Sequence, residues 1–207
     1  MSRRSSVITM GSFIYLCARV LGTLLFKLFF CLEVKGKENI RDIGKSCIIA
    51  SNHQSYLDPL ILGIVFPRRL RYFSKRDMFS IPVLSFLIRH LGAIPIDRDD
   101  MSSMTMRQGI KIIREGNWLV IFPEGTRSRT MELLEPKEGI GFLHYKTGAP
   151  VIPVYISGAG KALPVDAKCI RIAKIKVFIG KKVEIGGNDY KYIARKVMDA
   201  IRELKEQ

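Results

Sequence analysis

The residues best suited to chemistry are a histidine and an aspartate five positions apart, His53 and Asp58, in the segment NHQSYLD. The segment follows an apolar run that ends at Ser51 and leads into Pro59 and a further apolar stretch. If the chain turns between the two residues, the carboxylate can fix the imidazole tautomer and stabilise the imidazolium that forms when the other nitrogen takes a proton. The spacing therefore predicts a general base, His53, with Asp58 as its partner. The alternative is an incidental surface histidine beside an aspartate that caps a helix.

A second polar segment, FPEGTRSR at residues 122–129, follows another apolar run. Gly125 permits a close approach of the backbone to a ligand, and Arg127 carries a planar fork of N–H donors that suits a phosphate. Glu124 and Thr126 add polar groups to the same loop. The segment is typical of a phosphate-binding loop, and a polar turn with solvated arginines is the alternative.

Further cations stand at the ends of two other apolar runs. Arg98 closes the segment GAIPIDR, and Lys75 and Arg76 close the run before it. Cations at corresponding strand ends can converge on one anionic group, which favours a shared phosphate site. The alternative is an exposed ion pair between Asp97 and Arg98, which is ordinary at strand ends.

Strands must position these polar segments, because each segment follows a short apolar run bounded by turn residues. The sequence predicts strands at residues 47–51, 70–73, 92–96, 118–122, 151–156 and 170–179, and helices at 59–65, 83–91, 102–115, 138–147 and 190–205. Strands that alternate with helices indicate an α/β fold, a single domain with a mostly parallel central sheet flanked by helices. The polar segments then meet in the loops at the carboxyl ends of the strands.

The amino-terminal residues predict a helix on a membrane surface. Residues 7–32 are almost continuously apolar, but at about 100° per residue Arg19, Thr23 and Lys27 fall in one narrow stripe with Ser5 and Ser12. An arginine at the centre of a true span costs about 2.5–3.5 kcal/mol, whereas a helix in the plane of the interface lets Arg19 and Lys27 reach lipid phosphates. We expect an anchoring segment at residues 1–33 and a catalytic domain at residues 34–207. A single span and a cleaved signal peptide are the alternatives.

The composition limits the partners of the protein. A net charge of +15 indicates an anionic partner, which charge alone does not identify. The 34 Lys and Arg residues are dispersed and accompany no recognition motif, so we expect no binding to nucleic acid. The four cysteines and three histidines show no metal-ligand or disulfide spacing, which predicts no metal site and fits a reduced compartment. The sequence also lacks a nucleophile elbow, a P-loop and a dinucleotide fingerprint.

Four segments occur in order, NHQSYLD, GAIPIDR, FPEGTRSR and VIPVYISG, and with them the sequence closely resembles the bacterial 1-acyl-sn-glycerol-3-phosphate acyltransferases over residues 34–180. The resemblance implies that His53 is the base and that Asp58 orients it. It also implies that the glycerol phosphate is held by six further residues, Lys75, Arg98, Glu124, Gly125, Thr126 and Arg127. The fourth segment is tied to positioning or acyl binding, and Tyr155 stands there where a smaller residue is common.

The same resemblance implies direct transfer of a fatty acyl group to the sn-2 hydroxyl of lysophosphatidic acid, which forms phosphatidic acid without an acyl-enzyme. The donor is then the thioester of acyl carrier protein or coenzyme A, a co-substrate, with no tightly bound cofactor and no metal. We expect a monotopic protein on the cytoplasmic face of the inner membrane, whose basic surface meets anionic lipids. The alternatives are an acyltransferase for glycerol 3-phosphate or another lysolipid, and a non-catalytic phosphatidate-binding module.

Overall fold

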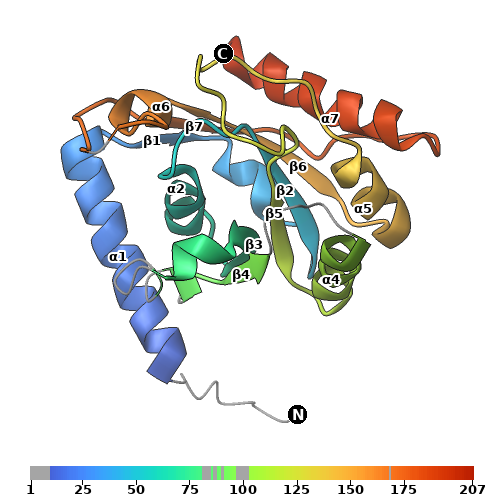
Figure 1. Ribbon diagram of the computed structural model, residues 1–207, viewed down its shortest axis with the longest axis horizontal. Coiled ribbons are helices and arrows are strands. Elements are labelled where there is room, and N and C mark those ends of the chain that lie inside the picture. Colours follow the sequence, from blue (N-terminus) through green and yellow to red (C-terminus); the bar gives the residue numbers. More distant parts are fainter. Residues whose placement is uncertain (1–9, 81–84, 86–87, 90, 97–102, 168) are drawn as a thin grey trace.

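A seven-stranded sheet crosses the centre of the protein in the computed structural model, which describes residues 10–80, 85, 88–89, 91–96, 103–167 and 169–207 (Figure 1). The strand order is β1-β7-β6-β2-β5-β3-β4. Neighbouring strands are parallel except β6 and β7, so β1 and β7 run opposite to the other strands. The strands are β1 (Glu33–Lys35), β2 (Cys47–Ser51), β3 (Leu70–Lys75), β4 (Ala93–Ile96), β5 (Trp118–Ile121), β6 (Val151–Ser157) and β7 (Lys176–Ile179).

Helices cover both faces of the sheet and divide the core into two clusters (Figure 1). The helices α1 and α2 lie on one face, and α4, α5 and α7 lie on the other. Their bounds are α1 (Met10–Phe30), α2 (Asp58–Val65), α4 (Ser103–Arg114), α5 (Gly139–Thr147), α6 (Ala159–Ala162) and α7 (Tyr190–Lys205), with the short 3-10 helices η1 (Lys37–Ile40) and η2 (Arg76–Phe79). The predicted α/β fold with a mostly parallel, helix-flanked sheet is therefore confirmed.

The central strand β2 shows why its sequence is a continuous apolar run. Every residue of β2 is buried. Alternate side chains point to opposite faces, so Ile49 enters the cluster with α2 while Ile48 and Ala50 enter the cluster with α4, α5 and α7. A strand covered on both faces has no solvated side, and it holds the loop that follows it rigidly.

The predicted strand at 170–179 is wrong in its first half, because only β7 forms. The antiparallel register pairs Lys176 with Ser157, the last residue of β6. Beyond that pair the chain of β6 turns at Gly158 into α6, so residues 170–174 have no neighbouring strand on that side. The side chains of Ile170 and Ile172 are consequently 60% and 85% exposed.

Two other differences concern short or undescribed segments. Strand β1 has three residues and was not predicted, because so short a run carries no periodic signal. It pairs with β7 at the edge of the sheet. The helix predicted at 83–91 lies largely outside the described residues, as does Arg98.

The helix α1 packs on the domain through Arg19, Gly22, Phe26 and Phe30, and it presents other apolar side chains outward. Arg19 donates to the carbonyl oxygen of Pro67 at 2.8 Å, and an added Cβ on Gly22 would stand 3.1 Å from Ile64. One N–H of the guanidinium is thus used within the protein, just beyond the end of α2, and contact of Arg19 and Lys27 with lipid phosphates stays a prediction. The outward face consists of Val20, Leu21, Leu24, Leu25, Leu28 and Phe29. Within the described residues, no helix combines the length and apolarity that crossing a bilayer requires.

Candidate active site

The predicted histidine–aspartate pair is formed in the turn between β2 and α2. Nδ1 of His53 lies 2.8 Å from Oδ2 of Asp58, and the same oxygen accepts from the backbone N–H groups of Gln54 at 2.7 Å and Ser55 at 2.8 Å. The carboxylate is 1% exposed. Because an ionised carboxylate only accepts, Nδ1 carries the proton of the neutral ring and Nε2 is left to take another. The geometry therefore suits a general base.

A buried asparagine holds this turn against the neighbouring strand. Asn52 donates from Nδ2 to the carbonyl oxygen of Ile156 at 3.0 Å, and its Oδ1 accepts from the N–H of the same residue at 2.7 Å. The side chain thus continues the hydrogen bonds of β2 and β6 after β2 has ended. This fixes the backbone one residue before His53.

The loop after β5 contacts His53 directly. The ring of Phe122 stacks on the imidazole, with centroids 3.9 Å apart and planes 15° from parallel. The backbone N–H of Ser128 donates to the carbonyl oxygen of His53 at 2.8 Å. The histidine is therefore positioned by two loops that are far apart in the sequence and adjacent at the carboxyl ends of β2 and β5.

Glu124 joins the same loops through its buried carboxylate, which is 2% exposed. Oε1 accepts from the backbone N–H of His53 at 2.9 Å, and Oε2 accepts from that of Leu134 at 3.0 Å. Burial raises the pKa of Glu124, and the two N–H donors partly offset that effect. With both oxygens occupied by the backbone, Glu124 acts as a positioning residue, and its contact with the glycerol stays a prediction.

Gly125 gives the loop a turn that other residues adopt poorly. Its φ is +68°, in the left-handed region, and its N–H donates to the carbonyl oxygen of Phe122 at 3.0 Å. A Cβ added there would stand 2.8 Å from Cδ of Lys137. The side chain of Lys137 therefore lies over the loop and brings a cation beside it, while Thr126 is exposed.

Arg127 is placed to receive an anion. Its guanidinium carbon lies 3.5 Å from the ring centroid of Tyr56, three residues after His53. Its Nη1 is buried and has no hydrogen-bond partner within the described part of the chain. A buried donor without a partner costs free energy, so this group is suited to a ligand that supplies an acceptor.

The predicted cation Lys75 lies at the end of β3, two strands away from the His53 turn. Lys75 ends β3, whose parallel register with β5 aligns its end with that of β2. Two strand spacings of about 4.8 Å put the end of β3 about 10 Å from the end of β2, within range of a lysine side chain for a shared ligand. Lys75 is exposed, and its binding to phosphate stays a prediction. Arg98 lies outside the described residues.

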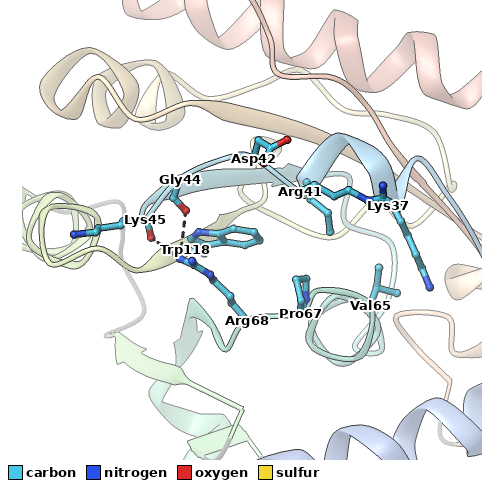
Figure 2. A pocket seen from close by; sticks show the side chains of 10 residues that line it. Lys37, Arg41, Asp42, Gly44, Lys45, Val65, Pro67, Arg68 and Trp118 are labelled. Carbon is cyan, nitrogen blue, oxygen red and sulfur yellow. Dashed lines mark hydrogen bonds between the residues drawn. The ribbon is translucent and has the colours of Figure 1, made fainter. Parts of the chain in front are cut away.

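A basic pocket of about 700 Å³ lies at the opposite edge of the sheet, where β2, β3 and β5 begin (Figure 2). Arg68 lies over Trp118 at 5.3 Å and donates to the carbonyl oxygens of Gly44 and Lys45. At about 3.3 Å per residue, β2 separates this pocket from His53 by about 17 Å. The pocket therefore takes no part in the site around His53.

Several residues of the site were given no role from the sequence, although they stand inside the quoted segments. Asn52, Tyr56 and Phe122 act through contacts with Ile156, Arg127 and His53. Each contact crosses between chain segments, so local spacing carries no signal for it. Tyr155, by contrast, is buried near Phe178 on the α7 side of the sheet, where burial raises the pKa of its hydroxyl.

The fold and the site define an α/β protein that carries a histidine–aspartate pair and an arginine at the carboxyl ends of parallel strands. The profile of the Acyltransferase family matches residues 31–157, more than half of the chain, and the chain belongs to that family.

Curated relatives and a solved structure agree with this membership. A chloroplastic 1-acyl-sn-glycerol-3-phosphate acyltransferase of Brassica napus is 31% identical over 75% of this chain and 46% of its own length. The 1-acyl-sn-glycerol-3-phosphate acyltransferase of Bacillus subtilis is 29% identical over 80% of this chain and 79% of its own. The crystal structure of the 1-acyl-sn-glycerophosphate acyltransferase of Thermotoga maritima superposes with a TM-score of 0.78 at 25% identity, over 95% of this chain and 80% of that one. The chain spans about half the length of the plant and algal relatives.

Proposed function

We propose that this protein transfers a fatty acyl group from a thioester to the sn-2 hydroxyl of lysophosphatidic acid and so forms phosphatidic acid. The observation that carries the proposal is the His53–Asp58 pair beside Arg127, whose buried Nη1 has no acceptor among the described residues. A base and a phosphate-binding donor in adjacent loops match the two ends of a glycerol phosphate acceptor. Family membership and the activities for which the relatives are named support the same reaction.

The mechanism follows from the protonation state of the pair. Nε2 of His53 takes the proton of the acceptor hydroxyl while the hydroxyl oxygen attacks the thioester carbonyl. Asp58 stabilises the imidazolium at 2.8 Å. The tetrahedral intermediate then collapses, the carbon–sulfur bond breaks, and the thiolate leaves with the proton that the imidazolium returns. No bond to the protein forms at any step.

The phosphate of the acceptor is held by cations around the same edge. Arg127 supplies N–H donors from a guanidinium that Tyr56 holds in place at 3.5 Å. We include Lys75 and Arg98 as further phosphate ligands, and the loop of Glu124, Gly125 and Thr126 as the glycerol site. Fixing the phosphate brings the hydroxyl to Nε2, which accelerates the reaction by orientation.

The donor and the location extend the proposal. The thioester belongs to acyl carrier protein or coenzyme A, both anionic, and the net charge of +15 favours their approach. The enzyme works on the cytoplasmic face of the inner membrane, where α1 rests its outward apolar face on the lipid.

Acyl transfer by the purified protein tests the proposal. Labelled donors of both kinds are offered with lysophosphatidic acid, glycerol 3-phosphate or a neutral lysolipid. We expect phosphatidic acid from lysophosphatidic acid, and a loss of about 10²–10⁴-fold in His53→Ala. His144→Ala is the matched control, because the ring of His144 bonds the carbonyl oxygen of Ala149 at 2.9 Å on α5, which lies on the far face of the sheet. Product from glycerol 3-phosphate alone, or full activity in His53→Ala, would contradict the proposal.

A further inference from the structure

The loop that joins α6 to β7 is tied at its start to the active site. The carbonyl oxygen of Leu163 accepts from Oγ of Ser55, within the turn of the histidine–aspartate pair, at 2.8 Å. Asp166 lies 3.8 Å from the guanidinium of Arg129, which ends the FPEGTRSR segment. The beginning of the loop is therefore bonded to the catalytic turn.

The end of the same loop is tied to the membrane-facing helix. The N–H of Ile175 donates to the carbonyl oxygen of Phe30, the last residue of α1, at 2.9 Å. Lys174 pairs with Glu33 at 2.6 Å, directly after that helix. Figure 1 shows this loop beside the end of α1 that leads into β1. The loop thus connects the catalytic turn to α1.

Between these two attachments the loop has two solvent-exposed isoleucines, Ile170 and Ile172. Ile172 is the most exposed large apolar side chain of the described residues, at 85%, and Ile170 is 60% exposed. They flank Arg171, whose backbone N–H donates to the carbonyl oxygen of Ala162 at 2.7 Å and fixes the loop. Two exposed isoleucines on a fixed loop gain free energy when an apolar surface covers them.

We propose that this loop inserts Ile170 and Ile172 into the lipid surface as a second membrane contact beside α1. The outward face of α1 continues toward the loop through Leu28 and Phe29, which are 74% and 49% exposed. Arg171 adds the cation that anionic head groups attract. Two contacts fix the orientation of the domain, whereas one helix alone would let it roll. They also hold the catalytic turn, which Ser55 joins to the loop, beside the bilayer. The role in orientation rests on the proposed use of a lipid acceptor, whereas the insertion itself does not.

The exposed thiol of Cys169 provides a probe at the edge of the loop. With Cys17 and Cys31 changed to serine and Cys47 buried, an environment-sensitive fluorophore on Cys169 reports the surroundings of Ile170. The control places the probe at position 192 by Tyr192→Cys in a Cys169→Ser background, on the exposed part of α7 across the sheet. On phosphatidylcholine vesicles that contain phosphatidylglycerol, we expect a blue shift at position 169 and none at position 192.

Vesicle titration of Ile172→Asp gives the second readout. We expect the lipid concentration for half-maximal binding to rise by about tenfold, with Tyr192→Asp unchanged. Neither side chain is buried, and aspartate suits the first turn of α7, so both variants should fold. Wild-type binding by Ile172→Asp together with a water-like spectrum at position 169 would overturn the proposal.

The two proposals fail separately in these experiments. Vesicle binding is measured without acyl donor. If the protein transfers no acyl group but its binding still depends on Ile172, the loop contact stands and the proposed function falls. If the protein is active but Ile172→Asp binds vesicles like the wild type, the proposed function stands and the loop contact falls. An equal loss of binding in Ile172→Asp and Tyr192→Asp would also overturn the loop contact, because it would show a general charge effect.

Discussion

Replacing Asp58 by asparagine removes the charge beside His53 and keeps the shape of the side chain. Oδ2 of Asp58 accepts from the ring of His53 and from the backbone N–H groups of Gln54 and Ser55. An amide oxygen in the same place can keep the two backbone donors. The imidazolium that forms during transfer then lacks its counter-charge, so Asp58→Asn should lower turnover while it preserves the fold.

The size of the effect follows from the distance and the burial of the pair. A unit charge about 4 Å from the centre of the imidazolium, at an effective dielectric constant of about 20, contributes about 4 kcal/mol. Asp58 is 1% exposed, so solvent screens it little. Since about 1.4 kcal/mol corresponds to a tenfold change in rate, the full loss is about 10³-fold. We expect a decrease in kcat of about 10²–10³-fold, because the proton is only partly transferred in the transition state.

Initial rates at saturating substrates, with thermal unfolding measured on the same preparations, test this prediction. Asp58→Ala serves as the contrast, because it leaves the N–H groups of Gln54 and Ser55 without their acceptor and should also lower the free energy of unfolding by about 1–3 kcal/mol. A folded Asp58→Asn whose kcat stays within about tenfold of the wild type would refute the reasoning.

Three further variants examine the groups around the pair. Arg127→Ala should lower kcat/KM for lysophosphatidic acid by about 10–100-fold, mostly through KM, because charged hydrogen bonds to phosphate are lost, and kinetics with each substrate varied in turn measure this. Asn52→Ala leaves both backbone groups of Ile156 without a partner and should lower the free energy of unfolding by about 1–3 kcal/mol in urea. For Glu124, the raised pKa means that the folded chain holds its proton more strongly than the unfolded chain does, so stability from this residue falls as pH rises above the ordinary value of 4.5. Glu124→Gln removes that dependence. The difference in unfolding free energy by which the wild type exceeds Glu124→Gln should therefore narrow between about pH 5 and about pH 8.

For each of these three predictions, one experimental outcome would contradict it. An unchanged KM for lysophosphatidic acid in Arg127→Ala would place the phosphate elsewhere, and a changed KM for the thioester alone would assign Arg127 to the donor. Wild-type stability of Asn52→Ala would mean that water replaces its two hydrogen bonds. A deficit of Glu124→Gln that widens with rising pH would show that the two N–H donors outweigh burial.

The parts of the fold that local sequence predicts are those that a single segment determines. The run at β2 is apolar because both of its faces are covered, and it was predicted at its observed bounds. The closeness of His53 and Asp58 follows from one turn between them, so spacing alone could suggest it. The alternation in residues 170–179 was equally local, but it was misleading. A strand needs a neighbouring strand to bond, and β6 ends where the chain turns at Gly158.

The contacts that sequence could not supply join segments far apart in the chain. The stacking of Phe122 on His53 depends on β5 lying beside β2, an arrangement that no periodic pattern encodes. Arg19 was placed on the lipid side because a helical wheel shows a polar stripe without showing what faces it. Its acceptor is a carbonyl group of residue 67, which the fold brings to the stripe.

The two acidic side chains of the site show how burial separates positioning from chemistry. Each oxygen of Glu124 accepts from one backbone donor, so the carboxylate joins two loops. Asp58 gathers its donors on one oxygen, and its Oδ1 is buried with no partner among the described residues. The oxygen that faces the ring, Oδ2, accepts from three N–H groups, which hold it 2.8 Å from Nδ1 of His53. Glu124 therefore joins the two loops that carry the site, whereas Asp58 orients the ring that becomes charged in the proposed mechanism.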